Sequence, residues 1–349
     1  MEGRPTPKPR SLHQDATGHW VRHWTGTDWF AAADSWVRDQ LTEAGITPTG
    51  DPVPYKIRFW AAVWCYPTTH GLYWFKENNP GQSFEAALVD AMARELPQHV
   101  IPPLAIDRTH GWLLTADQGA TLDEQLSHVD PLTLWRRLVV EYAALQRDTI
   151  PAEHPLLASG LTNAAPANLG AIVHTIADWF TNLAPNHPLA ITPTQSTHLH
   201  RAADNLTTYA TKLSGAIPLA IDQNDLHAHN VFAASPTAPF RFFDFGDSLW
   251  AHPFVTLACV HSALVDPDTW QENDPRLTEI TDAYLHEWTD LAPLEDLRTE
   301  LDTALPLHVV HRLISWHRLL VHADETEAAA WAFSPKHWIS EVIRLFGKD

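Results

Sequence analysis

The stretch of sequence that decides the fold is Asn224-Asp225-Leu226-His227-Ala228-His229-Asn230, which is followed further along by Asp244-Phe245-Gly246. Two short apolar segments, 231–234 and 240–243, lie between these motifs and predict a β-hairpin that carries the second motif back toward the first. Kinase-type phosphoryl transfer needs one carboxylate for the attacking hydroxyl, one amide oxygen for a metal ion and a second carboxylate that holds metal ions against the nucleotide phosphates. The spacing of the two motifs therefore predicts phosphoryl transfer.

Three residues of these motifs receive a predicted role. Asp225 is expected to be the catalytic base, which orients the acceptor hydroxyl and accepts its proton, while Asn230 and Asp244 are expected to bind Mg²⁺. Each residue alone would be taken for an ordinary loop residue, but their spacing around two apolar segments favours a catalytic set. His227 and His229 suggest a zinc site, but no third ligand follows at metal-binding spacing, so we expect His227 to support the loop through hydrogen bonds.

A lysine at the end of an apolar strand completes the predicted set. Lys76 follows Leu72-Tyr73-Trp74-Phe75 and is expected to reach the α- and β-phosphates of a nucleotide. Its expected partner is Glu85, near the start of the next helix, with Asp90 and Glu95 as the alternatives. Without the downstream motifs, a surface lysine would be the simpler interpretation.

The segment before Lys76 contains no glycine-rich phosphate loop. The small side chains of Ala61 and Ala62 occupy that place and would let backbone N–H groups approach a phosphate, although a plain apolar strand explains them as well. Farther along, the backbone from Thr115 to Asp117 is expected to form hydrogen bonds with the nucleotide base.

The order of the predicted elements divides the chain into two lobes. Residues 1–18 are polar and rich in proline, which predicts a disordered tail. Residues 19–118 predict a β-rich N-lobe that binds the nucleotide, and residues 119–349 predict a mainly helical C-lobe that carries the catalytic loop and the acceptor site; the fold class is therefore α+β. The expected N-lobe elements are helices over 27–45 and 84–96 and strands over 57–66, 71–76, 105–107 and 111–115. The clearest C-lobe helices are expected over 132–146, 169–183, 196–213, 277–288, 307–322 and 338–346.

The composition narrows the class of partner and leaves the oligomeric state open. A formal net charge of −19 opposes binding to nucleic acid or to an anionic membrane surface, and it is compatible with a cationic small molecule. No apolar run is long enough to span a bilayer, and the polar start does not resemble a secretory signal. Cys65 and Cys259 lie far apart in apolar surroundings, which favours two free thiols and a cytoplasmic protein over a disulfide framework.

Taken together, the motifs resemble those of the aminoglycoside phosphotransferase family, which are antibiotic and small-molecule kinases with a protein-kinase-like bilobal fold. The Asp-Leu-His-x-x-Asn loop of that family stands here as 225–230, and its Asp-Trp/Phe-Gly element stands as 244–246. Its Trp-x-x-Val segment stands as 60–63, its lysine as Lys76 and its Glu-Ala-Ala helix as 85–87. The resemblance extends from about residue 20 to the C-terminus, and it implies ATP or GTP as co-substrate together with Mg²⁺.

The chain departs from the family pattern just before the catalytic aspartate. Gln223-Asn224 stands where His-Gly is common in the family, and Ala61 replaces a hydroxyl-bearing residue of the loop that covers the phosphates. The replacement at Ala61 bears on how the β-phosphate would be bound. The resemblance indicates the reaction better than the acceptor, because members of the family phosphorylate aminoglycosides, other antibiotics, sugars, choline and amino-acid-like compounds.

The predicted function is a kinase that moves the γ-phosphate of ATP or GTP to a hydroxyl of a small molecule, with an antibiotic as the leading acceptor. A sugar, an aminosugar or another metabolite is the alternative acceptor, and so is a nucleoside antibiotic. An idle nucleotide-binding pseudokinase is the non-enzymatic alternative, but such a module has no need of Asp225. A protein kinase is disfavoured because no Ala-Pro-Glu segment follows Asp244.

Overall fold

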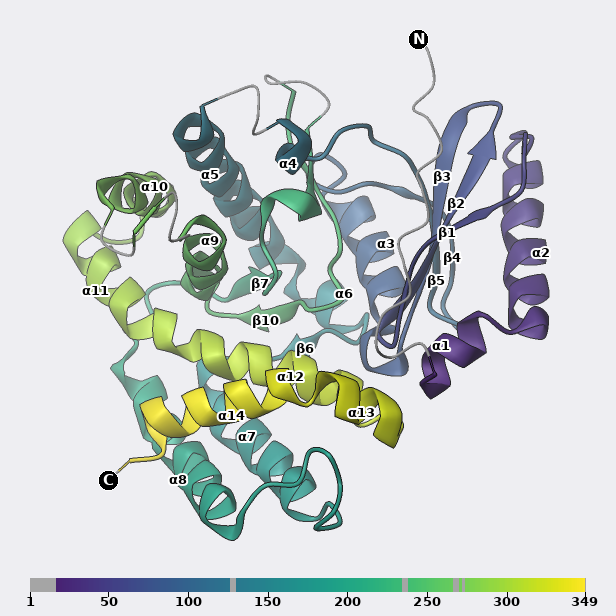
Figure 1. The fold of residues 1–349 in the computed structure, drawn as a ribbon. Helices are drawn as coiled ribbons and strands as arrows, with labels where there is room; N and C mark the ends of the chain where they lie inside the picture. Colours follow the sequence, from purple (N-terminus) through teal and green to yellow (C-terminus); the bar gives the residue numbers. More distant parts are fainter. Residues whose placement is uncertain (1–16, 126–129, 234–237, 266–269, 272–273, 349) are drawn as a thin grey trace.

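A computed structural model of the protein describes residues 17–125, 130–233, 238–265, 270–271 and 274–348 (Figure 1). A sheet-containing lobe built from the first part of the chain packs beside a mainly helical lobe built from the remainder. The predicted α+β class and bilobal architecture are therefore confirmed. The predicted tail over 1–18 lies outside the described residues except for its last two positions.

The N-lobe is built on a five-stranded antiparallel sheet with the order β1-β2-β3-β5-β4. Helix α2 (Thr27–Glu43) covers one face of this sheet and helix α3 (Glu85–Glu95) lies on the other side, as Figure 1 shows. The strands are β1 (Val53–Arg58), β2 (Ala61–Thr68), β3 (Gly71–Asn78), β4 (Pro103–Asp107) and β5 (Trp112–Ala116).

Successive side chains of β3 point to opposite faces of the sheet. Phe75 and Glu77 point toward α2 and the short helix α1 (His19–Trp24), where Phe75 is fully buried. Lys76 points to the opposite face, toward α3 and the C-lobe. Strand β3 therefore contacts the N-terminal helices through Phe75 and Glu77, and it places the charged Lys76 between the lobes.

The strand predicted over 57–66 is in fact two strands, so that prediction was wrong. β1 ends at Arg58 and β2 begins at Ala61, and the two residues between them form the turn of a hairpin. Phe59 in this turn is fully buried, and its ring centre lies 6.4 Å from that of Trp316 and 6.3 Å from that of Trp331 in the C-lobe. An apolar turn that is buried by another lobe looks like a continuous strand in the sequence.

The C-lobe contains all of the predicted long helices, with boundaries shifted by a few residues. Prolines begin several of them, because a residue in the first helical turn needs no N–H partner; among these helices, α8 also has a complete capping box formed by Thr192 and Gln195. The helices are α4 (Leu122–Gln125), α5 (Pro131–Thr149), α6 (Glu153–Leu157), α7 (Pro166–Thr181), α8 (Pro193–Tyr209), α9 (Leu257–Leu264), α10 (Pro275–His286), α11 (Leu294–Ala304), α12 (His308–Leu320), α13 (Glu325–Trp331) and α14 (Phe333–Phe346).

Two small sheets sit among these helices and support the motifs found in the sequence. One has the order β6-β10-β7, and the other pairs β8 with β9 as an antiparallel hairpin. Their strands are β6 (Thr162–Asn163), β7 (Ala220–Asp222), β8 (Val231–Phe232), β9 (Arg241–Phe242) and β10 (Leu249–Ala251). The hairpin predicted between the two motifs is therefore present, with shorter strands than expected.

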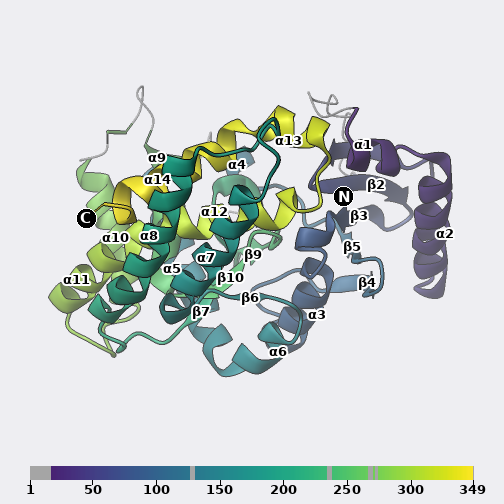
Figure 2. The ribbon, with the colours of Figure 1, turned by 90° about the horizontal axis from the view of Figure 1, so that it is seen from below.

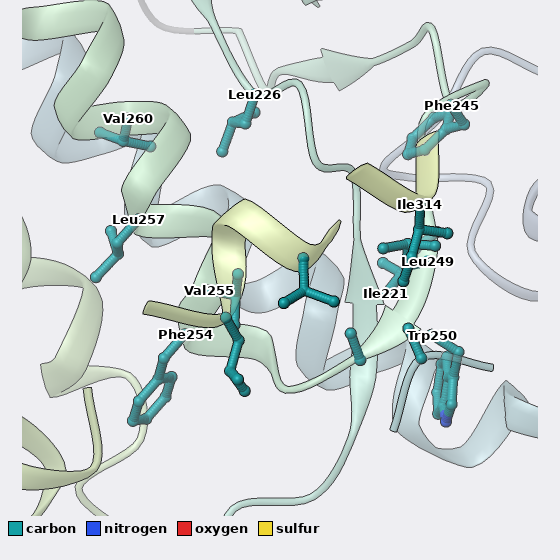
Figure 3. Close-up of a cluster of buried hydrophobic side chains, with 14 of the residues drawn as sticks. Ile221, Leu226, Phe245, Leu249, Trp250, Phe254, Val255, Leu257, Val260 and Ile314 are labelled. Atoms are coloured by element: carbon teal, nitrogen blue, oxygen red, sulfur yellow. The ribbon is translucent and has the colours of Figure 1, made fainter. Parts of the chain in front are cut away.

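A buried apolar cluster lies directly beneath these motifs (Figure 3). Leu226 of the first motif and Phe245 of the second are both fully buried in it, beside Ile221 of β7, Leu249 of β10 and Ile314 of α12. The apolar residues of the motifs thus anchor the loops, while the polar residues between them remain available for chemistry. Within the described residues, no helix has the length and apolarity that a membrane span requires.

Candidate active site

The two motifs form loops whose backbones are held in uncommon conformations. The first motif follows β7 and ends in the 3₁₀ turn Ala228–Asn230, and the second follows β9. Asn224 has a φ angle of 57° and Asp244 a φ angle of 61°, the left-handed region that residues other than glycine rarely adopt. Strained backbone of this kind persists only where the surroundings enforce it, and it concentrates at functional sites.

Lys76 joins the N-lobe to the second motif. Its Nζ atom lies 2.7 Å from Glu85 Oε2 on α3 and 2.5 Å from Asp244 Oδ1. The other oxygen of Glu85 accepts a hydrogen bond of 2.9 Å from the backbone N–H of Phe245. Glu85 is almost completely buried, so it fixes both the lysine and the loop that bears Asp244.

The opposite charges of Lys76 and Asp244 stabilise each other. Burial alone would lower the pKa of Lys76, but the carboxylates of Asp244 and Glu85 outweigh burial and raise that pKa above its usual value. Burial would likewise raise the pKa of Asp244, but the cations Lys76 and Lys56 hold it well below its usual value. Both groups are therefore charged at neutral pH.

Asp225 lies among polar groups from its own loop and from α12. Asn230 donates its side-chain N–H to the backbone oxygen of Asp225 at 3.0 Å, and His227 Nε2 lies 3.3 Å from Asp225 Oδ2. Arg312 Nη1 lies 3.3 Å from Asp225 Oδ1. Burial opposes ionisation of Asp225, but the hydrogen bond to His227 and the charge of Arg312 lower its pKa overall. The Asp225 carboxyl is therefore ionised at neutral pH.

Arg312 was missed by the sequence reasoning, although its helix was predicted. Besides Asp225, its guanidinium donates a hydrogen bond of 2.6 Å to the backbone oxygen of Asn224 and lies 3.8 Å from Asp247 Oδ2. The signal was present in the sequence: α12 is apolar apart from a row of polar residues that recurs at helical spacing, His311, Ser315 and Arg318 among them. A row of polar side chains on a buried helix indicates polar partners.

Gly246 lies close against the side chain of Gln82 from the N-lobe. A Cβ atom at this position would lie 2.9 Å from Gln82 Oε1 and 3.5 Å from Glu85 Oε2. Gln82 also donates a hydrogen bond of 2.8 Å to Asp247 Oδ1, so the turn after Asp244 is pressed against the N-lobe. A side chain at Gly246 would therefore press against the Gln82 carboxamide that binds Asp247.

A cavity of about 690 Å³ between the lobes collects most of the predicted site residues. Thr115 and Asp117 contribute to its wall at the hinge side, and Asp117 accepts a hydrogen bond of 2.9 Å from Trp74 Nε1. The predicted residues in the lining are Lys76, Glu85, Thr115, Asp117, Asp225, Asn230 and Asp244.

Ala61 and Ala62 are not brought to this cavity. Both are fully buried, and Ala62 belongs to the apolar cluster on the opposite face of the sheet, so neither is part of the described lining. Lys56 of β1, which the sequence reasoning did not single out, does line the cavity, and its charge lowers the pKa of Asp244. The β1–β2 hairpin therefore presents the side chain of Lys56 to the cavity, whereas the sequence had predicted that backbone N–H groups of Ala61 and Ala62 would approach a phosphate there.

The zinc alternative finds no support in the geometry. His227 is paired with Asp225, and His229 Nδ1 lies 3.2 Å from Asp123 Oδ2. Among the residues that the structure describes, no group of three or more histidine, cysteine or acidic side chains is placed to hold a metal ion. Cys65 and Cys259 are both free thiols, as expected.

The comparison with known proteins identifies the fold. No protein-family model matches the sequence, and no curated protein matches it at a significant level. Among solved structures, APH(2″)-IIia in complex with GDP and kanamycin aligns at 13% identity over 90% of this chain and 96% of that chain, with a TM-score of 0.53. The chain has the fold of the aminoglycoside phosphotransferases.

Two further structures have this phosphotransferase fold. The gentamicin complex of APH(2″)-IIa aligns at 12% identity over 90% of this chain and 96% of that chain, with a TM-score of 0.58. An ethanolamine kinase from Plasmodium vivax aligns at 10% identity over 92% of this chain and 88% of that chain, with a TM-score of 0.59. The resemblance inferred from the motifs is confirmed at the level of the fold.

Proposed function

We propose that the protein is a cytoplasmic kinase that transfers the γ-phosphate of ATP or GTP to a hydroxyl group of a small molecule. The observation that carries this proposal is the ion-paired junction of Lys76, Glu85 and Asp244 in the same cavity as Asp225. A module that only binds nucleotide would need the lysine but not a second, ionised carboxylate held by His227 and Arg312.

The nucleotide is proposed to occupy the N-lobe side of the cavity. Lys76 and Lys56 offer two cations for its phosphates, and the hinge segment 115–117 lines the cavity where the base is proposed to lie. Trp74 contributes an aromatic wall beside Tyr55, with ring centres 5.0 Å apart. The GDP bound in one structure of the same fold supports this assignment.

The donor atoms also suit Mg²⁺. Asp244 keeps one carboxylate oxygen beyond the one that meets Lys76, and Asn230 uses its amide N–H on Asp225, which leaves its amide oxygen for a metal. Oxygen donors of this kind are what Mg²⁺ prefers. When bound, the metal would neutralise charge on the nucleotide phosphates.

The proposed reaction is an in-line displacement. The acceptor's hydroxyl oxygen forms a bond with the γ-phosphorus while the bond from that phosphorus to the bridging oxygen breaks, and the nucleoside diphosphate leaves with the electron pair. Asp225 orients the hydroxyl and receives its proton. Because the pKa of Asp225 lies below its usual value, its carboxylate is available over the neutral pH range.

For the acceptor we propose a hydroxylated antibiotic that bears amines. Asp123 and Glu124 line the cavity on its C-lobe side, close to His229 of the catalytic loop, and the whole chain carries a formal charge of −19. This charge favours a cationic acceptor by raising its local concentration. An aminosugar, another metabolite or a nucleoside antibiotic is the second candidate.

A panel assay tests the proposal. The purified protein, Mg²⁺ and γ-labelled ATP or GTP would be incubated with aminoglycosides, macrolides, ethanolamine, free sugars and nucleoside antibiotics, with the Asp225→Asn variant as the control. Transfer of label to a panel member by the wild type but not by Asp225→Asn is the expected result. Nucleotide binding without transfer to any acceptor would favour the idle module instead.

A further inference from the structure

Two histidines on neighbouring helices face each other outside the cavity. His174 lies on α7 and His200 on α8, and Figures 1 and 2 show these helices side by side on the part of the C-lobe remote from the N-lobe sheet. The two Nδ1 atoms are 3.2 Å apart, and the ring centres are 5.5 Å apart. The proposed kinase mechanism uses neither residue.

A carboxylate lies beside the far nitrogen of each ring, at hydrogen-bond distance for His174 and farther away for His200. His174 Nε2 lies 2.9 Å from Asp204 Oδ1, and His200 Nε2 lies 3.6 Å from Asp178 Oδ1. Each helix thus supplies a histidine and an aspartate one turn later, and the pairs cross from one helix to the other. A carboxylate on the distal ring nitrogen is the usual second contact of a histidine that binds a metal, because it fixes the tautomer and the ring orientation.

This arrangement leaves two lone pairs facing each other. When each neutral ring places its proton on Nε2, toward its carboxylate, both Nδ1 atoms are unprotonated and carry lone pairs. Two lone pairs at 3.2 Å repel each other unless a cation lies between them. The pair therefore holds either a proton on one Nδ1 atom, which makes an ordinary hydrogen bond between two neutral rings, or a metal ion that accepts both lone pairs.

We propose that His174 and His200 form a binding site for a divalent transition-metal ion of the Zn²⁺ class. Zinc binds imidazole nitrogen at about 2.0–2.1 Å, so two ligands at a tetrahedral angle are about 3.3 Å apart, close to the separation of the two Nδ1 atoms. Nitrogen ligands select this class over Mg²⁺ and Ca²⁺. The protein supplies two ligands, water completes the coordination, and Asp204 orients the ring of His174.

A metal at this place would link α7 to α8. Both rings are partly exposed, with side-chain exposures of 40% for His174 and 32% for His200, so an ion can reach them from solvent. α7 packs against α12 and α8 packs against α14, so the link would stiffen the helices on which the catalytic loop rests. Binding would raise the temperature of unfolding, because a ligand of the folded state stabilises that state.

Titration with the metal alone tests the site. The full-length protein is freed of metal with a chelator, and ZnCl₂ binding is measured by calorimetry and by the shift of the thermal midpoint. His174→Ala and His200→Ala are each expected to lose one bound Zn²⁺ per chain. Asp204→Asn is expected to weaken binding about 10–100-fold, as loss of such a carboxylate contact does in other metal sites.

His198→Ala is the matched control, because His198 precedes His200 by two residues on α8 and therefore points to a different side of the helix. It should bind Zn²⁺ as the wild type does. Circular dichroism without metal checks that the alanine variants fold, and Cu²⁺ electron paramagnetic resonance with two nitrogen couplings provides an independent readout. Equal Zn²⁺ stoichiometry and affinity in the wild type and both alanine variants would overturn the proposal and leave an ordinary hydrogen bond between the rings.

Discussion

The pKa and the position of Asp225 depend on its neighbours, and only some of these neighbours belong to its own loop. His227 and Asn230 belong to the same motif and contact Asp225 directly, whereas Arg312 comes from a helix far along the chain. A carboxylate that is partly buried but has several donors around it remains ionised. The residue can therefore accept a proton at neutral pH without losing its position in the loop.

Replacing Asp225 with asparagine should remove proton acceptance while preserving the shape of the loop. We expect kcat to fall about 10²–10⁴-fold, the usual range for loss of a general base. The dissociation constant of the nucleotide should stay close to that of the wild type, because Asp225 is proposed to meet the acceptor. Steady-state kinetics measure kcat, and titration with nucleotide measures the dissociation constant. Unchanged turnover would contradict the assignment of Asp225 as the base.

The Asp244→Asn change should behave differently, because Asp244 is proposed to bind the metal and is also paired with Lys76 at 2.5 Å. We expect weaker binding of the magnesium–nucleotide complex together with lower turnover. Calorimetry with a non-hydrolysable nucleotide, with and without Mg²⁺, is the measurement. A variant with wild-type affinity in the presence of Mg²⁺ would rule out the metal role.

Helix α12 is the element that holds the loops of both motifs in place. Ser315 Oγ lies 3.0 Å from the side-chain nitrogen of Asn224, and it donates a hydrogen bond of 3.1 Å to the backbone oxygen of Asp247. Arg318 donates hydrogen bonds of 3.2 Å to the backbone oxygens of Gly246 and Ser248. A single buried helix thus contacts both motifs, which explains how the strained conformation of Asn224 is kept.

Arg312 is the residue of α12 whose loss should affect the reaction most. We expect Arg312→Gln to lower kcat at least about 10-fold while the KM for nucleotide changes little, because it orients Asp225 and does not line the nucleotide part of the cavity. Arg312→Lys should recover part of the loss. Arg344→Gln, which removes an exposed guanidinium, is the control. Equal losses in kcat and stability for Gln and Lys would indicate a purely structural role.

Strand β3 anchors the N-terminal helices through a buried carboxylate. Glu77 accepts hydrogen bonds from three indole N–H groups: Trp24 Nε1 at 3.0 Å, Trp29 Nε1 at 2.7 Å and Trp112 Nε1. These tryptophans come from α1, α2 and β5, so one side chain joins three elements. Three of the 16 tryptophans of the chain take part in this contact.

Glu77→Gln should therefore destabilise the protein. The amide keeps only one acceptor oxygen and turns an N–H group toward an indole donor, so we expect the free energy of unfolding to fall by about 2–3 kcal/mol. Urea denaturation measures this quantity. Glu43→Gln at the exposed end of α2 should change it by less than about 0.5 kcal/mol. Equal stabilities for the two variants would show that the indole contacts contribute little.

The two lobes also contact each other away from the hinge, where α1 meets α13 (Figure 1). α1 docks on the start of α13 through hydrogen bonds from the backbone N–H groups of His19 to Asp324 at 2.8 Å and of Trp20 to Glu327 at 2.6 Å. With Trp24 bound to Glu77, this short helix contacts both lobes. The N-terminal helices thus connect the two lobes independently of the hinge.

The stability of the whole chain should depend on pH through buried histidines. Burial, with the charge of Arg318 beside it, lowers the pKa of His317 to about 4, and its Nε2 atom is buried without a hydrogen-bond partner. As the pH falls below the unfolded value of about 6.5, the unfolded chain takes up the proton first. Stability from this residue is therefore present above about pH 6.5 and is lost between about 6.5 and 4.

His317→Phe should flatten this dependence, because the ring is kept and the titration is removed. We expect the loss of unfolding free energy between pH 7.5 and pH 5 to shrink by about 1–2 kcal/mol relative to the wild type. Urea denaturation at both pH values is the measurement, with the exposed His154→Phe as the control. An unchanged slope in His317→Phe would mean that other groups cause the acid sensitivity.

Local patterns were enough to predict the bilobal α+β fold and the proposed catalytic set. The motifs 225–230 and 244–246 lie close together along the chain, and the apolar segments between them specify a hairpin, so their meeting is a local event. Helical periodicity likewise revealed the long helices of the C-lobe, because each of them buries one regular face. Phe59 and Trp60 were misassigned because their burial depends on the other lobe.

The sequence by itself determined the set of residues proposed to carry the chemistry, namely Asp225, Asn230, Asp244 and Lys76, because each lies in a motif with a local spacing. Only the tertiary structure decided which distant side chains surround them. Arg312 reaches Asp225 across 87 positions of the chain, and Lys56 rather than the backbone of Ala61 and Ala62 faces the cavity. The physical reason is that the charge and orientation of a buried group depend on all of its neighbours in space, and packing rather than local sequence pattern brings those neighbours together.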